Sequence, residues 1–247
     1  MPGYDTVIVG VPVGTHTFRL KSLLDRQQYS DPRGEAGDVG ICSSSWPYFG
    51  WLWPAARVLA EAMTQIDISG RRILEIGCGL GLPSLVLKRN GADITASDHH
   101  PLVEPFLDFN AALNDMPPID FVDLRWDEPM HELGRFDVSI GSDVLYERGH
   151  AELLAQLLER HSKPRAEVWM SCPGRGYLGR FNRALRAQGF EVTAKAHSGL
   201  QADFRGRLLR YRRHPLQCAT TLLSRRSTPA THRAAPAAGV QALDAAA

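Results

Sequence analysis

The sequence lacks any apolar run that approaches the roughly 18 residues of a membrane-spanning helix. It also lacks an excess of charge, because 28 basic residues are balanced by 27 acidic ones and leave a formal net charge of +1. A near-neutral chain gives no general argument for binding nucleic acid or an anionic membrane surface. We therefore expect neither a nucleic-acid partner nor a membrane partner.

Cysteine is scarce, with four in 247 residues. They form no C-x-x-C pair, and their wide spacing indicates neither a zinc site nor a disulfide framework: Cys42, Cys78, Cys172 and Cys218. His99 and His100 are adjacent, which is not the spacing of metal ligands, so no metal is expected. Residues 1–14 lack the basic start of a secretory leader, and the expected compartment is the reducing cytoplasm.

What the sequence does contain is 44% hydrophobic residues, enough for one sizeable core. The chain is organised around residues 71–82, RRILEIGCGLGL. A short apolar run leads into glycines at alternate positions, Gly77, Gly79 and Gly81, and a helical pattern follows. This order predicts a buried strand, a tight turn and a helix N-terminus. Glycine accepts the positive φ of such a turn and lets a ligand approach the backbone.

The glycine pattern is not the dinucleotide fingerprint G-x-G-x-x-G, because Leu82 stands where that fingerprint needs its third glycine. Glu75, just before the turn, is an awkward neighbour for a pyrophosphate but suits a ligand with cationic groups. S-adenosylmethionine carries an ammonium and a sulfonium, and no phosphate. Asp98, 23 residues after Glu75, ends the next predicted strand, where an acid can accept hydrogen bonds from both ribose hydroxyls. The alternatives are an ordinary strand-to-helix turn, with Cys78 as a small residue that fits, and Asp98 as a helix cap.

Predicted strands and helices alternate from residue 71 onward. Strands are expected near 71–76, 92–97, 119–122, 136–141, 166–171, 190–196 and 204–212, and helices near 82–90, 101–114, 149–161 and 176–188. Repeated strand–helix units imply a parallel sheet with right-handed crossovers. The last two strands have no helix between them, so they can form an antiparallel hairpin at one sheet edge. The expected fold class is α/β and Rossmann-like, with seven strands and helices on both faces.

We expect three parts in the chain. Residues 1–45 hold two short strands and then a polar stretch, residues 25–45, that predicts a loop or a lid. Residues 46–214 form the cofactor-binding domain. Residues 215–247, rich in Ala, Pro and Thr, predict a disordered tail.

An aromatic cluster opens the central part. Residues 46–54 contain three of the five tryptophans, and Pro54 suits the first turn of a helix. These aromatic side chains are interpreted either as core packing or as a wall beside a bound cofactor.

Arginines alternate along the last expected strand, at Arg205, Arg207, Arg210, Arg212 and Arg213. They are interpreted as the charged protection of a solvated edge strand, or as a dock for an acidic protein surface.

Polar and aromatic residues follow the third and fourth predicted strands of the central run. Trp126 follows the third strand, where it is placed to line an adenine pocket, and Ser142, Asp143 and Tyr146 follow the fourth. Ligands of open α/β sheets bind off the carboxyl ends of the strands, at the topological switch point. We therefore expect these residues and the glycine turn to surround one crevice.

The combination resembles the protein-lysine methyltransferases of the seven-β-strand, methyltransferase-like group, which are class I S-adenosylmethionine-dependent methyltransferases. The resemblance covers roughly residues 45–213 and depends on four motifs: W-P-A-A at 53–56, E-I-G-C-G-L-G at 75–81, L-R-W at 124–126 and S-D-V-L-Y at 142–146. It implies S-adenosylmethionine as cofactor, bound by Trp53, Glu75, Gly77, Cys78, Gly79, Gly81, Asp98, Trp126 and Ser142. It also implies that Asp143 and Tyr146 shape the lysine site as catalytic residues. The substrate does not carry over, because members of the group act on different proteins.

Methyl transfer to lysine needs a neutral amine, whereas the reference pKa of lysine is about 10.4. An apolar channel beside a positive charge lowers that pKa. Asp143 is then expected to orient the amine or take up its proton through water, and Tyr146 to hydrogen-bond the amine or stack on its stem. The alternatives are that Asp143 only caps a turn and that Tyr146 is part of the core.

Three other functions stay open from the sequence. The second hypothesis is a small-molecule methyltransferase that acts on an amine or a hydroxyl. The third is a module that binds the cofactor without catalysis. A nicotinamide-dependent oxidoreductase is the fourth, and Leu82 and Glu75 weigh against it.

Overall fold

The computed structural model describes residues 4–29, 31, 33–197 and 205–213. The predicted tail, residues 215–247, lies outside the described residues, whereas those that are described belong to one compact unit. Within them, no helix is both long enough and apolar enough to cross a membrane.

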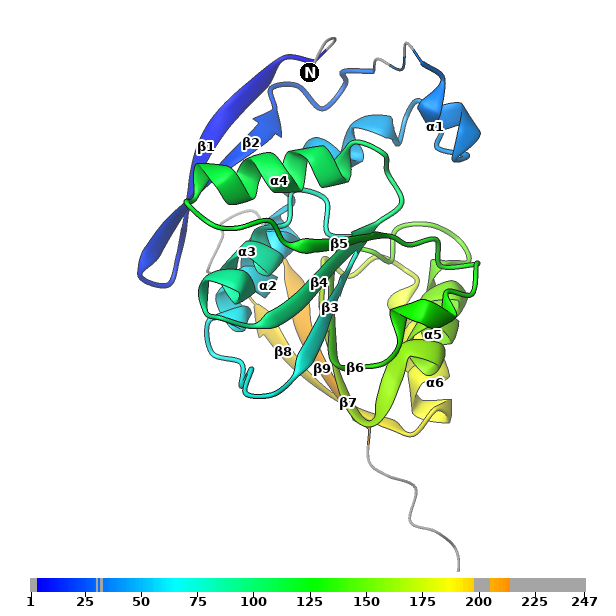
Figure 1. Cartoon of the computed structure of the whole chain (residues 1–247). Coiled ribbons are helices and arrows are strands. Elements are labelled where there is room, and N and C mark those ends of the chain that lie inside the picture. The colour runs from blue at the N-terminus through cyan, green and yellow to red at the C-terminus, as the bar shows by residue number, and fades with distance from the viewer. Residues whose placement is uncertain (1–3, 30, 32, 198–204, 214–247) are drawn as a thin grey trace, which may run out of the picture. The chain divides into compact units, whose positions relative to one another are not determined.

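A mixed sheet forms the centre of the described part (Figure 1). It has seven strands among the described residues, in the order β5-β4-β3-β6-β7-β9-β8. Their bounds are β3 Arg72–Ile76, β4 Asp93–Asp98, β5 Asp120–Asp123, β6 Phe136–Ser142, β7 Ser162–Cys172, β8 Phe190–His197 and β9 Gly206–Arg213. β3 pairs in parallel with both β4 and β6, and β9 pairs antiparallel with β7 and β8. The predicted fold, a mostly parallel sheet with an antiparallel edge hairpin, is confirmed.

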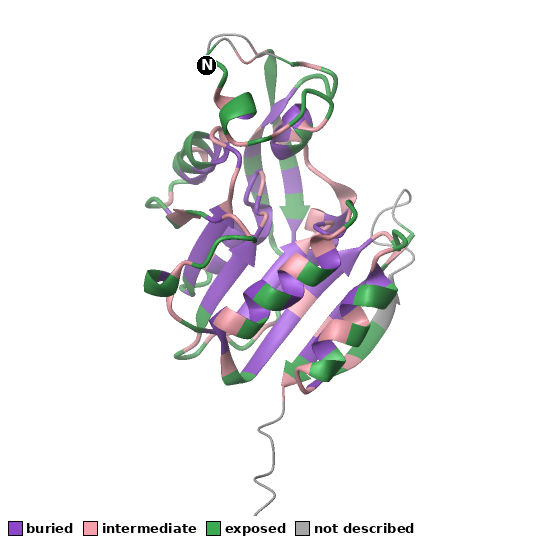
Figure 2. Cartoon of the chain, turned by 90° about the vertical axis from the view of Figure 1, so that its right-hand side faces the viewer, coloured by how far each residue is buried: buried purple, intermediate pink, exposed green. Residues whose placement is uncertain are grey.

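Helices cover both faces of this sheet. α2 (Pro54–Met63), α3 (Leu82–Arg89) and α4 (Val103–Leu113) enclose one core, and α5 (His150–His161) and α6 (Leu178–Ala187) enclose the other. Figure 2 shows the strands buried beneath α5 and α6, whose outer faces are exposed. Proline begins α2 and sits in the first turn of α3, where a missing N–H costs no helical hydrogen bond.

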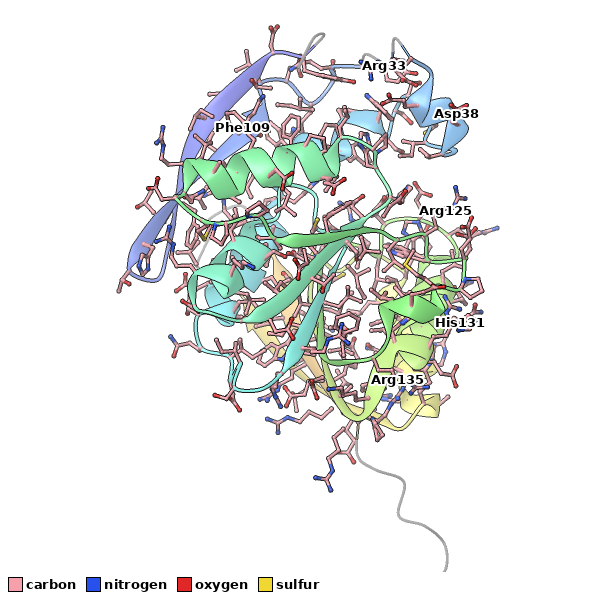
Figure 3. The ribbon with its side chains drawn as sticks, viewed as in Figure 1. Arg33, Asp38, Phe109, Arg125, His131 and Arg135 are labelled. Carbon is pink, nitrogen blue, oxygen red and sulfur yellow. The ribbon has the colours of Figure 1, made fainter. Side chains whose placement is uncertain are left out.

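The N-terminal strands β1 (Thr6–Val13) and β2 (His16–Leu23) form the expected hairpin, a separate two-stranded sheet. Asn110 of α4 and Asn114, the C-cap of that helix, hold it. The Asn114 side chain accepts a hydrogen bond from Arg19 N–H (2.8 Å) and donates one to Arg19 C=O (2.7 Å). Asn110 accepts one from Lys21 N–H at 2.7 Å. In Figure 3, Phe109 lies on α4 beside the hairpin, where the Lys21 ammonium stands 4.6 Å from its ring centre.

The expected role of the last-strand arginines as edge protection is wrong. β9 lies inside the sheet between β7 and β8, so β8 is the edge strand. Arg210 instead makes a bidentate pair with Glu167 of β7 (2.8–3.0 Å), and Arg213 lies over the Phe190 ring at 4.5 Å. The alternating arginines predicted a strand at β9, but they did not predict which strands lie beside it.

Candidate functional site

A glycine turn joins β3 to α3. Gly77, Gly79 and Gly81 have φ of +63°, +52° and +73°, the left-handed region that favours glycine. The backbone of Cys78 ties the turn to the neighbouring strand, because its N–H donates to Ser97 C=O of β4 at 2.9 Å. A Cβ added at Gly81 would lie 2.3 Å from Leu107 Cδ1 of α4, so this glycine is also required by close packing. Positive φ at all three positions and close packing at Gly81 together require glycine in this turn.

Asp98 ends β4 and holds the turn from the side. Its Oδ2 accepts a hydrogen bond from Gly79 N–H at 3.1 Å, and its Oδ1 accepts from His99 N–H (2.9 Å) and His100 N–H (3.1 Å). It does not N-cap α4, which begins five residues further along at Val103 with Leu102 as its cap. Burial raises the pKa of Asp98, against the effect of its N–H partners. The side chain is 13% exposed, so the carboxylate still presents a face to a ligand.

A cavity of about 770 Å³ opens off the carboxyl ends of β3, β4 and β6. From β3 the chain runs to β4 and β5 on one side and then returns to β6 on the other, so the topological switch point of the sheet lies between β3 and β6. The structure brings all the predicted site residues except Glu75 to its wall: Trp53, Gly77, Cys78, Gly79, Gly81, Asp98, Trp126, Ser142, Asp143 and Tyr146. The volume lies within the roughly 300–1,000 Å³ of small-molecule sites.

Glu75 is the exception, because its side chain is fully buried beneath the turn. Its Oε2 accepts hydrogen bonds from Ser84 N–H (2.9 Å) and from the Ser84 hydroxyl, while its Oε1 has no partner. Ser84 lies in the first turn of α3, so Glu75 satisfies a helix N-terminus from inside the fold. Burial raises the pKa of Glu75 from its usual 4.5 to about 8. A direct contact between this carboxyl and a ligand in the cavity does not follow from its position.

Asp143 and Tyr146 follow β6 and line the same cavity. Asp143 has a φ of +53°, rare for a residue with a side chain, and its N–H donates to Ser171 C=O at 2.8 Å. Its carboxylate accepts two hydrogen bonds from Arg175, from Nε at 2.9 Å and from Nη2 at 3.0 Å. Tyr146 packs edge-on against Tyr48 at 6.3 Å between ring centres. Burial raises the pKa of Tyr146, so its phenol stays protonated at neutral pH.

Two residues of this region were missed from the sequence, Arg175 and His150. Arg175 lies between two glycines after β7, and a charged residue after a central strand was the available signal. His150, the first residue of α5, lines the cavity with its ring edge-on to Trp126 and Tyr146. Its Nδ1 lies 3.0 Å from Val144 C=O and must donate to it, which leaves Nε2 facing Glu147 at 3.6 Å. Burial lowers the pKa of His150, so the ring is neutral at pH 7.

The aromatic cluster divides between the two interpretations that the sequence offered. Trp46 and Phe49 are buried, and their rings lie 4.1 Å and 4.0 Å from the ring of His100. Burial lowers the pKa of His100 to about 3, which keeps this packed imidazole neutral. Tyr48, Trp51 and Trp53 line the cavity, and Phe49 reaches its wall as well.

Part of the predicted lid also reaches the cavity. Residues 39–42 and Ser45 line it, following the short helix α1 (Glu35–Asp38) and preceding the 3-10 turn η1 (Trp46–Gly50). Figure 3 shows Asp38 and Arg125 on the same side of the molecule, on segments far apart in the sequence. Whether this stretch closes over a ligand stays a prediction.

Comparison with known proteins gives one family match. The family model described as "Lysine methyltransferase" matches residues 48–181. Protein N-lysine methyltransferase METTL21A of Danio rerio is 32% identical over 129 residues, 49% of this chain and 59% of that protein. Histone-arginine methyltransferase METTL23 of Rattus norvegicus is 31% identical over 158 residues, 58% of this chain and 70% of that protein. The electron transfer flavoprotein beta subunit lysine methyltransferase of Xenopus laevis is 29% identical over 165 residues, 65% of this chain and 64% of that protein.

Solved structures share the fold at lower identity. The Thermus thermophilus 16S rRNA N2 G1207 methyltransferase RsmC, in complex with AdoMet and guanosine, has a TM-score of 0.62 at 15% identity, covering 86% of this chain and 52% of that one. A ribosomal protein L11 methylase from Lactobacillus delbrueckii has a TM-score of 0.51 at 21% identity, covering 66% and 81%. At these identities the likeness concerns the fold alone.

Proposed function

This chain belongs to the lysine methyltransferase family, and on that premise we propose that it transfers a methyl group from S-adenosylmethionine to a lysine side chain of a protein. The observation that carries the proposal is the single cavity that contains both motif sets. The glycine turn and Asp98 line it, and so do Asp143 and Tyr146. The chain spans about 60% of the METTL21A relative, so both activity and substrate remain proposals.

The chemistry of the cavity wall fits this cofactor. The partly exposed Asp98 carboxylate is an acceptor suited to two ribose hydroxyls, and Trp126 offers an indole face for adenine. The N-terminal end of α3 offers a positive dipole end to a carboxylate. Trp53, Cys78 and Ser142 complete this end of the wall, as the family resemblance implies. When bound, S-adenosylmethionine supplies a methyl group on a positively charged sulfonium.

The residues of the chain position the acceptor amine and deal with its proton. Tyr48, Tyr146 and Trp53 form an aromatic wall along which a lysine stem can lie, partly shielded from bulk water. Exclusion of water lowers the pKa of the amine and favours the neutral form that has a lone pair. Asp143 attracts the incoming ammonium. Alignment of the reacting groups can supply much of the rate acceleration.

His150 is a candidate proton acceptor that the sequence did not indicate. Its Nδ1 hydrogen bond to Val144 fixes the tautomer, and Nε2 carries the free lone pair of a neutral ring. A neutral imidazole at a cavity wall is a suitable general base.

A protein arginine is the second candidate acceptor. One observation favours it: the Asp143 carboxylate already binds a guanidinium in a bidentate pair. A relative, METTL23 of Rattus norvegicus, bears the name of a histone-arginine methyltransferase.

The test combines purified protein, methyl-labelled S-adenosylmethionine and a bacterial lysate separated into protein and small-molecule fractions. We expect label in a discrete protein band, on lysine after hydrolysis, and its loss with Asp143→Asn. Asp108→Asn, an exposed aspartate of α4 outside the cavity, is the matched control and should label the band as wild type does. Label on arginine would select the second candidate, and label confined to small molecules would refute both. Asp98→Asn should raise the Kd for S-adenosylmethionine about tenfold or more in calorimetry, because it weakens hydrogen bonds to a charged acceptor.

A further inference from the structure

The Asp143–Arg175 pair joins a nearly buried anion to a half-exposed cation. The Asp143 side chain is 9% exposed and the Arg175 side chain 43%. Both hydrogen bonds have the short, parallel geometry of a bidentate pair, at 2.9 and 3.0 Å. Among the described residues, Asp143 makes no other ion pair. A carboxylate this far from water needs a cation, and Arg175 is the one that it has.

The two partners differ in how firmly their backbones are held. Asp143 is fixed at the end of β6 by its left-handed backbone and by the hydrogen bond to Ser171 of β7. Arg175 lies between Gly174 and Gly176 in the loop that leaves β7, and a Cβ added at either glycine would meet nothing within 4 Å. Glycine on both sides gives the backbone of Arg175 a wide range of conformations. The carboxylate is therefore the fixed element of the pair, and the guanidinium is the element that can move.

The pair also lies where the acceptor is expected. Asp143, Arg175, Tyr48 and Tyr146 all line the cavity. An ammonium or guanidinium on an aliphatic stem would meet the same carboxylate that Arg175 occupies. The subsite thus already holds a cation of the chemical class that it is proposed to bind.

We propose that Arg175 is a displaceable internal cation, which fills the acceptor subsite at Asp143 until the cationic side chain of a substrate replaces it. The identification of this subsite as the acceptor site rests on the proposed function. Exchange of one cation for another never leaves the buried carboxylate unpaired, so its cost is low. A neutral acceptor, such as an alcohol, has no charge with which to displace Arg175. The residue therefore selects cationic acceptors, and it lowers their apparent affinity by the fraction of time that it occupies the subsite.

The experiment measures binding of acceptor fragments and needs no methyl transfer. Butylammonium and ethylguanidinium serve as cationic probes and 1-butanol as the neutral one, titrated into the full chain and followed by tryptophan fluorescence and NMR. The variants are Arg175→Ala, Asp143→Asn and the double variant. Arg180→Ala is the matched control, an arginine of α6 that is 54% exposed and pairs with Glu152 at 3.9 Å. Arg175→Gln replaces Arg175→Ala if the alanine variant does not fold.

We expect Arg175→Ala to bind at least one cationic probe about tenfold more tightly than wild type, since an internal cation present nine-tenths of the time reduces affinity by that factor. The gain should vanish in the double variant, and neither 1-butanol nor Arg180→Ala should show it. Unchanged affinity in Arg175→Ala, or a gain that persists without the Asp143 charge, would overturn the proposal. The gain in cation binding without methylation of any protein would refute the proposed function and leave the displaceable cation standing. Methylation of a protein without the gain in cation binding would overturn the displaceable cation and leave the proposed function standing.

Discussion

The buried carboxyl of Glu75 should make the stability of this protein fall as pH rises. Glu75 is fully buried, and one of its oxygens has no hydrogen-bond partner. Its pKa is raised to about 8 in the folded protein, whereas an unfolded chain restores the usual 4.5. The folded state therefore binds the proton more tightly. Its contribution to stability is fully present below pH 4.5 and is lost as pH rises towards 8.

The size of the effect follows from linkage. Where the folded state carries one proton more than the unfolded state, the free energy of unfolding falls by about 1.4 kcal/mol for each pH unit. With a folded pKa of about 8, the loss between pH 6 and pH 8 is about 2 kcal/mol. Glu75→Gln removes the titration and resembles the protonated carboxyl, since its amide oxygen can still accept from Ser84. The variant should exceed wild type by about 2 kcal/mol at pH 6 and by about 4 kcal/mol at pH 8, so its advantage grows by about 2 kcal/mol over this range.

The assay is equilibrium urea unfolding at pH 6, 7 and 8, followed by tryptophan fluorescence. Asp98 and His100 titrate in both proteins, so the difference between the two curves reports Glu75. Glu152→Gln, which removes a half-exposed carboxylate on α5, should follow wild type at every pH. A constant offset between Glu75→Gln and wild type across the three pH values would refute the reasoning. Calorimetry with S-adenosylmethionine adds a second result, because a tenfold loss of affinity would support the sequence-based prediction that Glu75 contacts the cofactor.

Two further predictions concern the fold around the site. Gly81→Ala should lower the free energy of unfolding by about 2–4 kcal/mol in urea unfolding. Alanine is disfavoured in the left-handed backbone at this position, and its Cβ would collide with Leu107. Gly91→Ala, equally left-handed but with free space, should cost about 1–2 kcal/mol, and equal losses would show that packing contributes nothing. Asn114→Ala should release the N-terminal hairpin from α4 and speed its proteolysis, with a loss of about 2 kcal/mol from three broken hydrogen bonds. Unaltered proteolysis beside an exposed control, Asp108→Ala, would contradict that role.

The order of elements was predictable because it depends on local pattern. Alternating apolar runs and helical periodicity placed each strand and helix of the sheet within a few residues, and the glycine turn marked the centre. The position of β9 between β7 and β8 was not predictable in this way, since the same arginine alternation suits an edge strand or an inner strand paired with Glu167. Which strands become neighbours is decided by contacts between residues distant in sequence.

The site residues divide in the same way, into those that a local motif marks and those whose position depends on contacts between distant segments. Residues on the glycine turn and at the ends of β4 and β6 were identified because each motif lies within one segment. Glu75 shows the limit of that logic. Its carboxyl accepts hydrogen bonds from Ser84, nine residues further along the sequence, and only the packed fold places it beneath the turn and outside the cavity lining.

Arg175 and His150 show why the chemistry of a site exceeds its motif. The sequence pattern S-D-V-L-Y suggests an aspartate with no ion-pair partner in the protein, available to bind an amine. In the fold, Asp143 is neutralised by an arginine 32 residues further along, and a neutral histidine with a fixed tautomer stands behind Tyr146. The Asp143 carboxylate already binds a guanidinium in a bidentate pair, which makes it a site for cations. We therefore propose that Asp143 binds the cation and that His150 takes up the proton, two roles that the motif alone would give to one residue.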